Sequence, residues 1–294
     1  YDQLWMTTSL RGLISGNLSV EILQEGVHSG DASGIVPSSF RILRSILSRI
    51  EDENTGEVHL EALRIPVPTE RHVQAVATAT ALGAEVYSKF PWVEGARPVV
   101  DHHAELILNR TWRPALSITG IDGIPGLSSA GNVLRPKTTV KLSLRIPPRI
   151  DPRAATAALK AVLERDPPYG AKVRFDGEKA SVGWDAPPLA PWLAASIDGA
   201  SRAYFGAPVM AMGEGGSIPF MGMLGERFPE AQFLITGVLG PQSNAHGPNE
   251  FLHVPMGKKL TACVAMVLQQ HFDRPLGKPK AAPKSKGAPK KAGK

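Results

Sequence analysis

TVKLSLRI, residues 139–146, gives the clearest signal of the fold, because apolar and polar residues alternate along it without a break. Its even-numbered positions from Val140 to Ile146 are aliphatic, and its odd-numbered positions include Lys141, Ser143 and Arg145. A period of two places successive side chains on opposite faces of a strand. The stretch therefore predicts a β-strand with one buried face and one polar face, and Arg145 lies on the polar face.

The segments around this strand complete a known order of elements. A strand is predicted at residues 18–22, an amphipathic helix at 36–50 with Pro37 in its first turn, and a strand at 116–121. An Ala-rich helix at Pro152–Arg165 and a strand at Lys172–Trp184, interrupted near Gly177, follow the central strand. Strand, helix, strand, strand, helix, strand is the order of a split βαβ, or ferredoxin-like, domain.

The remaining segments have a different character. Helices are predicted at 193–204 and 256–268, and the nearly continuous apolar run Phe233–Leu239 is typical of a parallel strand that is covered on both faces. This pattern predicts the end of an α/β domain. Residues 57–110 contain a Pro-rich piece and a helix predicted from Glu70 to about Lys89, but no motif that we can interpret.

The formal charge of +6 is concentrated at one end of the chain. Residues 273–294, DRPLGKPKAAPKSKGAPKKAGK, hold eight Lys/Arg and one acid, so this tail is +7 and the other 272 residues are −1. With few apolar residues, the tail is predicted to be a disordered polycation. It is either a solubilising tail or a weak binder of nucleic acid or acidic surfaces.

Composition excludes several classes of protein. One cysteine, Cys263, excludes an intramolecular disulfide and a cysteine zinc site, and it suits a reducing compartment. No apolar run approaches the roughly 18 residues of a membrane span. The first residues, YDQLWMTTSL, do not form a signal peptide. We therefore expect a cytoplasmic protein without a membrane partner.

Three glycine-containing loops carry polar groups that could do chemistry. They are VHSGDASG with His28, GEGGSIPF at 213–220, and SNAHGPNEF at 243–251 with His246. Histidine can shuttle protons or bind metal, and consecutive backbone amides can bind an anion. Each loop taken alone is more often a simple turn than a site. The sequence contains no HExxH, GxGxxG, Walker A or GxSxG motif.

Six motifs in order give the chain a family resemblance. They are His28-Ser29-Gly30, SITGIDG at 117–123, Asn132-Val133, LSLR at 142–145, GEGGSIP at 213–219 and HGPNE at 246–250. From Tyr1 to about Phe272 the chain resembles the di-metal peptidases of the carnosine dipeptidase, aminoacylase and desuccinylase group. The resemblance is closest to the carnosine dipeptidase branch.

The resemblance implies an α/β fold in two parts, the C-terminal portion of a three-layer zinc-peptidase domain and an inserted split-βαβ lid that forms a homodimer. The implied divisions are residues 1–10 as the end of an N-terminal catalytic segment, 11–183 as the lid, 184–272 as catalytic domain and 273–294 as the tail. The implied cofactors are two divalent metal ions, commonly zinc, or manganese in some members. The implied substrates are small peptides or N-acyl amino acids.

The resemblance also implies roles for individual residues. His246 matches a metal ligand, and His28 matches the lid histidine that steadies the oxyanion in the partner subunit. Arg145 matches the residue that binds the substrate carboxylate, and Asn132 stands near a contact made by the partner. Gly216 and Ser217 match the loop that holds the substrate backbone. A guanidinium fork suits a carboxylate, and prepositioned donors suit an oxyanion.

The other metal ligands of the family, an HxD pair, a bridging Asp, a Glu-Glu pair and a further acid, are not found in this sequence. We therefore expect the C-terminal portion of a metal-dependent amide hydrolase that is inactive alone. The alternative is a non-catalytic dimerisation module left after loss of the metal-binding half. A third hypothesis, nucleic-acid binding, rests on the tail alone.

Overall fold

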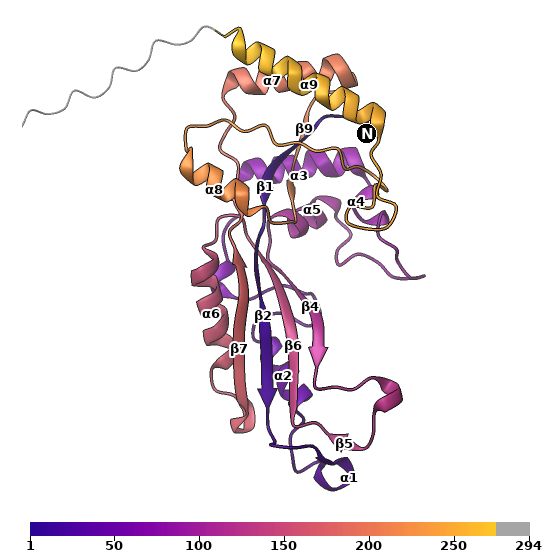
Figure 1. Ribbon diagram of the computed structural model, residues 1–294, viewed down its shortest axis with the longest axis vertical. Helices are drawn as coiled ribbons and strands as arrows, with labels where there is room; N and C mark the ends of the chain where they lie inside the picture. Colours follow the sequence, from indigo (N-terminus) through magenta and orange to yellow (C-terminus); the bar gives the residue numbers. More distant parts are fainter. Residues whose placement is uncertain (275–294) are drawn as a thin grey trace, which may run out of the picture.

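The computed structural model describes residues 1–274 and shows an elongated molecule built from two larger sheets, a short two-stranded sheet and their helices (Figure 1). The lower part in this view is the lid, and the upper part contains both chain ends of the described region. The predicted disordered tail falls outside the described residues from position 275 onward.

The lid is a four-stranded antiparallel sheet in the order β4-β6-β2-β7. Its strands are β2 (Gly12–Glu21), β4 (Ala115–Asp122), β6 (Lys137–Ile146) and β7 (Lys172–Ser181). Leu13 pairs with Arg145, and Glu21 pairs with Lys137. This connectivity and strand order confirm the predicted split-βαβ fold.

Helices α2 (Ser39–Leu47) and α6 (Pro152–Glu164) pack on the lid core, which the apolar faces of the strands form (Figure 1). On β6, residues 140, 142, 144 and 146 are buried, whereas Lys141 is exposed and Arg145 is half-buried, as alternation predicts. Asp151 caps α6 by accepting a hydrogen bond from the Arg153 amide. Helix α2 begins at Ser39, so Pro37 precedes the helix instead of lying in its first turn.

The end of the lid farthest from the second sheet is built from short elements, namely β3 (Val27–His28), α1 (Ser29–Ala32) and β5 (Val133–Leu134) (Figure 1). Strands β3 and β5 pair with each other, and His28 lies opposite Val133. We call this group the lid tip.

Short 3-10 helices lie at Glu61–Leu63, Leu127–Ser129 and Pro168–Gly170.

The second sheet has the order β8-β1-β9. Strand β1 (Trp5–Leu10) runs parallel to β9 (Met210–Glu214) and antiparallel to β8 (Trp184–Asp185). Helices α7 (Pro191–Phe205) and α9 (Val254–Phe272) pack together over a core that includes Leu4, Ile197 and Cys263, and α8 (Pro219–Arg227) packs beside β8. The mixed α/β class is therefore confirmed.

Three helices lie between α2 and β4, where the sequence predicted a single helix. They are α3 (Thr69–Leu82), α4 (Glu85–Ser88) and α5 (His103–Thr111). The long helix predicted from Glu70 to Lys89 is broken at Gly83, whose φ of +53° suits glycine. Although α3 and α5 lie inside the range expected for the lid, Ala75, Ile107 and Leu108 pack near Met212 of β9.

The strand predicted at Phe233–Leu239 is wrong, because this segment has no strand assignment. It lies beside β1, where the Thr7 amide donates to the Ile235 carbonyl at 2.8 Å and Thr236 Oγ1 donates to the Trp5 carbonyl. Its side chains are only partly buried, so the apolar run marks an extended segment beside a sheet and not a covered internal strand.

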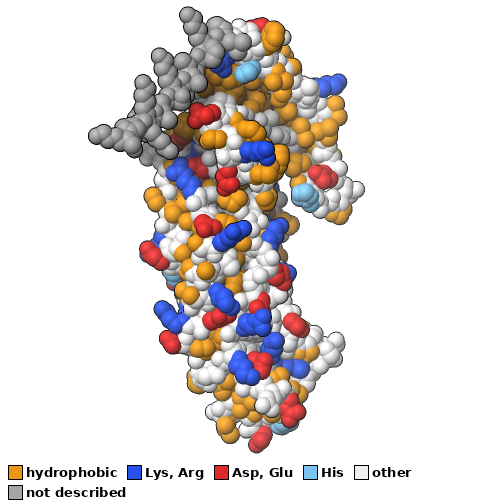
Figure 2. Space-filling view, turned by 60° about the vertical axis from the view of Figure 1, so that its left-hand side comes forward, with side chains coloured by type: hydrophobic (Ala, Val, Ile, Leu, Met, Phe, Trp, Pro, Cys, Tyr) orange, Lys and Arg blue, Asp and Glu red, His pale blue; other side chains and the backbone are white. Residues whose placement is uncertain are grey.

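Helix hydropathy and surface charge bear on possible partners. Within residues 1–274, no helix is long and apolar enough to cross a membrane. On the face shown in Figure 2, Lys and Arg side chains are interspersed with Asp and Glu along the lid. Positive and negative side chains thus alternate on this face, and neither sign forms a large patch along the lid.

Candidate substrate-carboxylate site

Arg145 meets the glycine-rich loop where the lid joins the second sheet. Its Nη1 donates to Ser217 Oγ at 3.2 Å, and Ser217 Oγ donates to the backbone carbonyl of Arg11 at 2.7 Å. Strand β6 aims Arg145 from the polar face of the lid sheet, and Ser217 follows Glu214, the last residue of β9. The two predicted substrate-binding residues are therefore brought together from positions 72 apart in the chain.

The glycines of the loop after β9 differ in how closely they are packed. Gly216 is exposed, and a Cβ placed on it would have open space around it. At Gly215, by contrast, a Cβ would lie 2.9 Å from the Arg110 carbonyl oxygen and 3.2 Å from Arg11 Nη2. Gly215 thus permits close packing of the loop against two arginines.

Arg11, between β1 and β2, is hydrogen-bonded to the backbone of this loop. Its side chain is 7% exposed, and its Nε donates to the Gly215 carbonyl at 3.3 Å. Its Nη1 donates to the carbonyls of Asn109 and Arg113, which lie near the end of α5. Burial first, and then the charges of Arg145 and Arg110, lower the pKa of Arg11 to about 10.

His28 and Asn132 form a second group at the lid tip. Both are exposed, and the Ser29 amide donates to the Asn132 carbonyl at 2.9 Å. A Cβ at Gly30 would lie 2.7 Å from His28 Cε1, so the glycine makes room for the imidazole ring. The HSG motif therefore has a local steric explanation.

The lid tip and the Arg145 site are far apart within one chain. Arg145 pairs with Leu13 and Lys137 with Glu21, so eight residues of β6 separate the two ends of the lid sheet. At about 3.3 Å per strand residue this is roughly 26 Å, and His28 lies beyond that end. Within one subunit, His28 and Asn132 therefore do not share a site with Arg145 and Ser217.

His246, the predicted metal ligand, lies on an exposed loop with a left-handed backbone at φ +60°. Its backbone amide donates to Glu250 Oε2 at 3.3 Å. No group of three or more His, Cys, Asp or Glu side chains in residues 1–274 is placed so that it could hold a metal ion. One histidine cannot hold two cations, so the donors present do not fit a two-metal centre.

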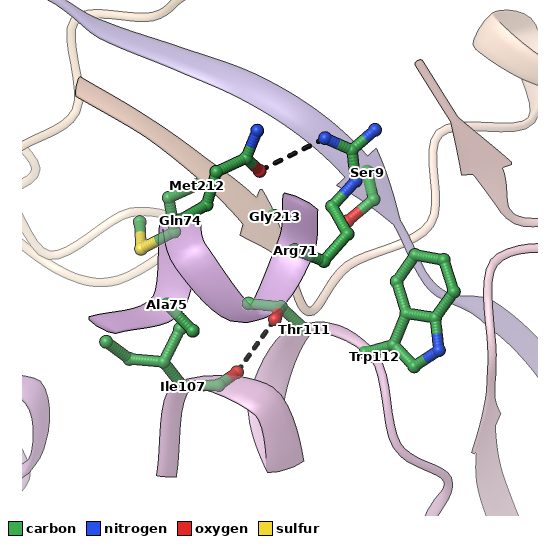
Figure 3. Close-up of a pocket in the computed structure, with 9 residues that line it drawn as sticks. All are labelled: Ser9, Arg71, Gln74, Ala75, Ile107, Thr111, Trp112, Met212 and Gly213. Atoms are coloured by element: carbon green, nitrogen blue, oxygen red, sulfur yellow. Dashed lines mark hydrogen bonds between the residues drawn. The ribbon is translucent and has the colours of Figure 1, made fainter. Parts of the chain in front are cut away.

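The small cavity drawn in Figure 3 is too small for a substrate. It lies between α3, α5, β1 and β9, and its volume of about 10 Å³ is room for roughly one water molecule. Figure 3 shows Arg71 of α3 reaching the side chain of Gln74, with an Nη1 to Oε1 distance of 3.1 Å. The cavity belongs to the packing between the helices and the small sheet.

Sequence reasoning missed Arg11 and Arg110, although both contact the predicted loop. Neither lies in a local motif, and Arg11 is 204 positions from the loop residue that it binds. One signal was present, because Arg11 is a charged residue between the apolar stretches of β1 and β2. A charge at such a place is seldom buried without polar partners.

Comparison with known proteins identifies the family of the lid sheet. Residues 8–171 match the peptidase dimerisation domain of the M20 family. The cysteinylglycine-S-conjugate dipeptidase of Corynebacterium striatum is 27% identical over 272 residues, which cover 86% of this chain and 55% of that protein. The chain thus spans about half the length of this curated relative.

Solved structures show the same fold. The di-peptidase Dug1p of Saccharomyces cerevisiae aligns with a TM-score of 0.70 and 20% identity over 93% of this chain and 57% of that one. Human carnosine dipeptidase 1 aligns with a TM-score of 0.66 and 20% identity over 92% of this chain and 57% of that one.

A split-βαβ sheet joined to a smaller mixed sheet with its helices defines the class of fold, an α/β protein with a dimerisation domain. The chain belongs to the M20 peptidase dimerisation domain family. The resemblance inferred from the six motifs is confirmed at the level of the family.

Proposed function

We propose that this chain supplies the dimerising lid and the carboxylate-binding site of a metal-dependent dipeptidase or acyl-amino-acid hydrolase. The hydrogen bond from Arg145 to Ser217 supports this proposal most directly, because it places a guanidinium fork beside an open glycine loop. Residues 11–183 would form the lid, and residues 1–10 with 184–272 would form part of the catalytic domain.

The chemistry assigned to these residues is binding and orientation. Arg145 would pair with the free carboxylate of a short substrate, and the backbone amides near Gly216 and Ser217 would hold the substrate chain. His28 of one subunit would donate to the oxyanion in the other. The metal ions and most of their ligands would come from a polypeptide segment outside this chain, so we derive no step through them.

The carboxylate site is tested by ligand binding to the chain itself. We expect ligand-observed NMR to detect Gly-Gly but not its C-terminal amide, because the amide lacks the charge that Arg145 would bind. Arg145→Met should weaken Gly-Gly binding at least about tenfold, through loss of a charge-assisted bidentate pair. The control Arg202→Gln changes a surface arginine that pairs with Asp198 on α7, and it should bind normally. Equal binding of Gly-Gly and its amide would contradict the assignment.

The NMR comparison of Gly-Gly with its amide also separates the hydrolase hypothesis from the alternative of a non-catalytic dimerisation module. The non-catalytic dimerisation module is favoured by the lack of a metal cluster in residues 1–274 together with a complete lid sheet. Such a module would form the dimer without selective binding of peptide carboxylates. Nucleic-acid binding through the tail would instead survive Arg145→Met and be lost on deletion of residues 273–294.

We place the dimer contact at strand β4, an edge of the lid sheet. Ile118 and Ile121 of β4 are 47% and 52% exposed, and Asp122 is the one charged residue of the strand. The opposite edge, β7, carries several charges that discourage strand pairing. An edge strand with two exposed isoleucines and a single charge at its end favours addition of a second copy of β4.

A single charge at this edge should prevent dimer formation. We expect Ile118→Lys to shift the chain from dimer to monomer in sedimentation velocity, because a lysine would be buried without a partner at the pairing edge. Val73→Lys on α3 is the matched control, since Val73 is 64% exposed and lies outside the lid sheet. A dimer that persists in Ile118→Lys would place the contact elsewhere.

A further inference from the structure

The end of β9 and the loop that follows it, Met212–Ser217, are contacted by three arginines that are far apart in the chain. Arg11 donates to the Gly215 carbonyl, and Arg145 donates to Ser217 Oγ. Arg110 of α5 donates through Nη2 to Met212 Sδ at 3.2 Å, and its Cγ lies beside Gly215. This six-residue segment thus has three guanidinium groups around it.

These three arginines differ in what they can still bind. Arg11 is buried, and its hydrogen bonds go to three backbone carbonyls, so it supplies charge without an obvious place for a ligand. Arg145 donates to Ser217 Oγ, next in sequence to the exposed Gly216, and is the proposed partner of the substrate's α-carboxylate. Arg110 is 29% exposed and has spare donor capacity.

Arg110 has only a weak ion pair with an acidic side chain. Its Nη2 lies 3.8 Å from Glu214 Oε2, which is long for a charge-assisted hydrogen bond. Its Nε is buried and has no hydrogen-bond partner within residues 1–274. Partial burial and the charge of Arg110 lower the pKa of Lys89, which shows that a further basic group is near. Positive charge exceeds negative charge around the loop.

We propose that this site selects peptides or N-acyl amino acids whose last residue is acidic. Resting on the proposed function, the α-carboxylate pairs with Arg145 and the side-chain carboxylate of Asp or Glu pairs with Arg110. Two carboxylates a few bonds apart suit two guanidinium groups that border one short loop. The dianion also reduces the mutual repulsion of the three arginines.

Arg110 could instead serve only to hold α5 against β9 through Met212 and Glu214. In that case its removal would lower stability without changing the choice of ligand. The two roles are separated by comparing ligands of equal shape and unequal charge, so the pair Gly-Asp and Gly-Asn is the critical probe, with Gly-Gly as the reference for the α-carboxylate alone.

The test measures dissociation constants of the purified chain by NMR titration at low salt, where screening is weak. We expect Gly-Asp to bind about tenfold more tightly than Gly-Asn, the scale of one charge-assisted hydrogen bond. Arg110→Gln should reduce the ratio to near one and leave Gly-Gly binding intact. Arg202→Gln removes one positive charge from α7 and should leave the ratio unchanged.

A second variant covers the case in which Arg110→Gln does not fold. Glu214→Gln removes the acid that competes for Arg110 and should tighten Gly-Asp binding relative to Gly-Asn. Equal affinity for Gly-Asp and Gly-Asn, with Gly-Gly still bound, overturns this inference and leaves the proposed function standing. If none of the three peptides binds, both proposals fail. A ratio that survives Arg110→Gln overturns the role of Arg110.

Discussion

Replacing Asp185 by Asn is expected to lower the free energy of unfolding by about 3–5 kcal/mol, the range for removing one partner of a buried ion pair. Asp185 Oδ1 accepts hydrogen bonds from Arg71 Nε at 3.0 Å and Nη2 at 2.8 Å. The side chains of both residues are 8% exposed. Asn keeps the volume of Asp but leaves the buried guanidinium with only the exposed Glu70, whose Oε1 lies 3.4 Å from Arg71 Nη1, as its counter-charge.

The position of Asp185 explains why the loss should be felt globally. Its Oδ2 accepts from Arg149 Nε at 2.7 Å, and Arg149 lies in the connection between β6 and α6 of the lid. Arg71 comes from α3, which packs on β9, and Asp185 itself belongs to β8. One carboxylate thus joins the lid, the small sheet and α3.

Urea unfolding followed by circular dichroism measures this effect, with the slope of the transition checked for each variant. Glu178→Gln is the matched control, because Glu178 pairs with Lys141 on the exposed face of the lid sheet. Screening by water makes such a pair weak, so its unfolding midpoint should hardly change. An Asp185→Asn midpoint equal to that of the control would show that the buried pair does not stabilise the fold.

Local sequence patterns were sufficient for the lid. The alternation at residues 139–146 and the spacing of apolar residues in α2 and α6 follow from one buried face per element, and such periods are visible in sequence. Sequence patterns gave a wrong strand at Phe233–Leu239. An apolar run shows that a segment is partly buried, but it does not show whether its backbone forms the regular hydrogen bonds of a strand. Sequence patterns also failed at α5, where burial depends on Met212, about 100 positions away.

The candidate site was predicted in part for the same reason. Arg145 could be placed on a polar strand face from its neighbours, and Ser217 stood out because it follows two glycines. Arg110 has no local signal, and the charge of Arg11 between two apolar stretches does not show what it binds, because tertiary folding brings both residues to the loop. Whether His28 and His246 act as predicted depends on groups outside one copy of this chain.

A covalent dimer is expected when His28→Cys and Gly216→Cys are combined in one chain and oxidised mildly. Roughly 26 Å of sheet separates the lid tip from the Arg145 site within a subunit, whereas a disulfide needs Cα atoms within about 7 Å. An intramolecular bond between these positions is therefore excluded by geometry. A bond can form only if the lid tip of one subunit reaches the loop of another.

Both positions tolerate the change. His28 is exposed, and Gly216 has open space where the new side chain would go. The native Cys263 is 1% exposed, and burial raises the pKa of its thiol, so it should not react. The control combines His28→Cys with Thr261→Cys on α9, an exposed position in the part of the molecule opposite the lid tip (Figure 1).

Non-reducing electrophoresis reads the result directly. Most of the His28→Cys, Gly216→Cys chain should migrate as a dimer that reductant converts to monomer, and the control should remain monomeric. Ile118→Lys added to the cross-linking pair should abolish the covalent dimer, because the lid contact must form before the tip can reach the partner. A chain that sediments as a dimer yet never cross-links would refute a site completed by His28 of the partner subunit. A covalent dimer would show that the lid tip of one subunit reaches the Gly216 loop of the other. His28 and Arg145, which are far apart within one chain, would then belong to one site formed by two subunits.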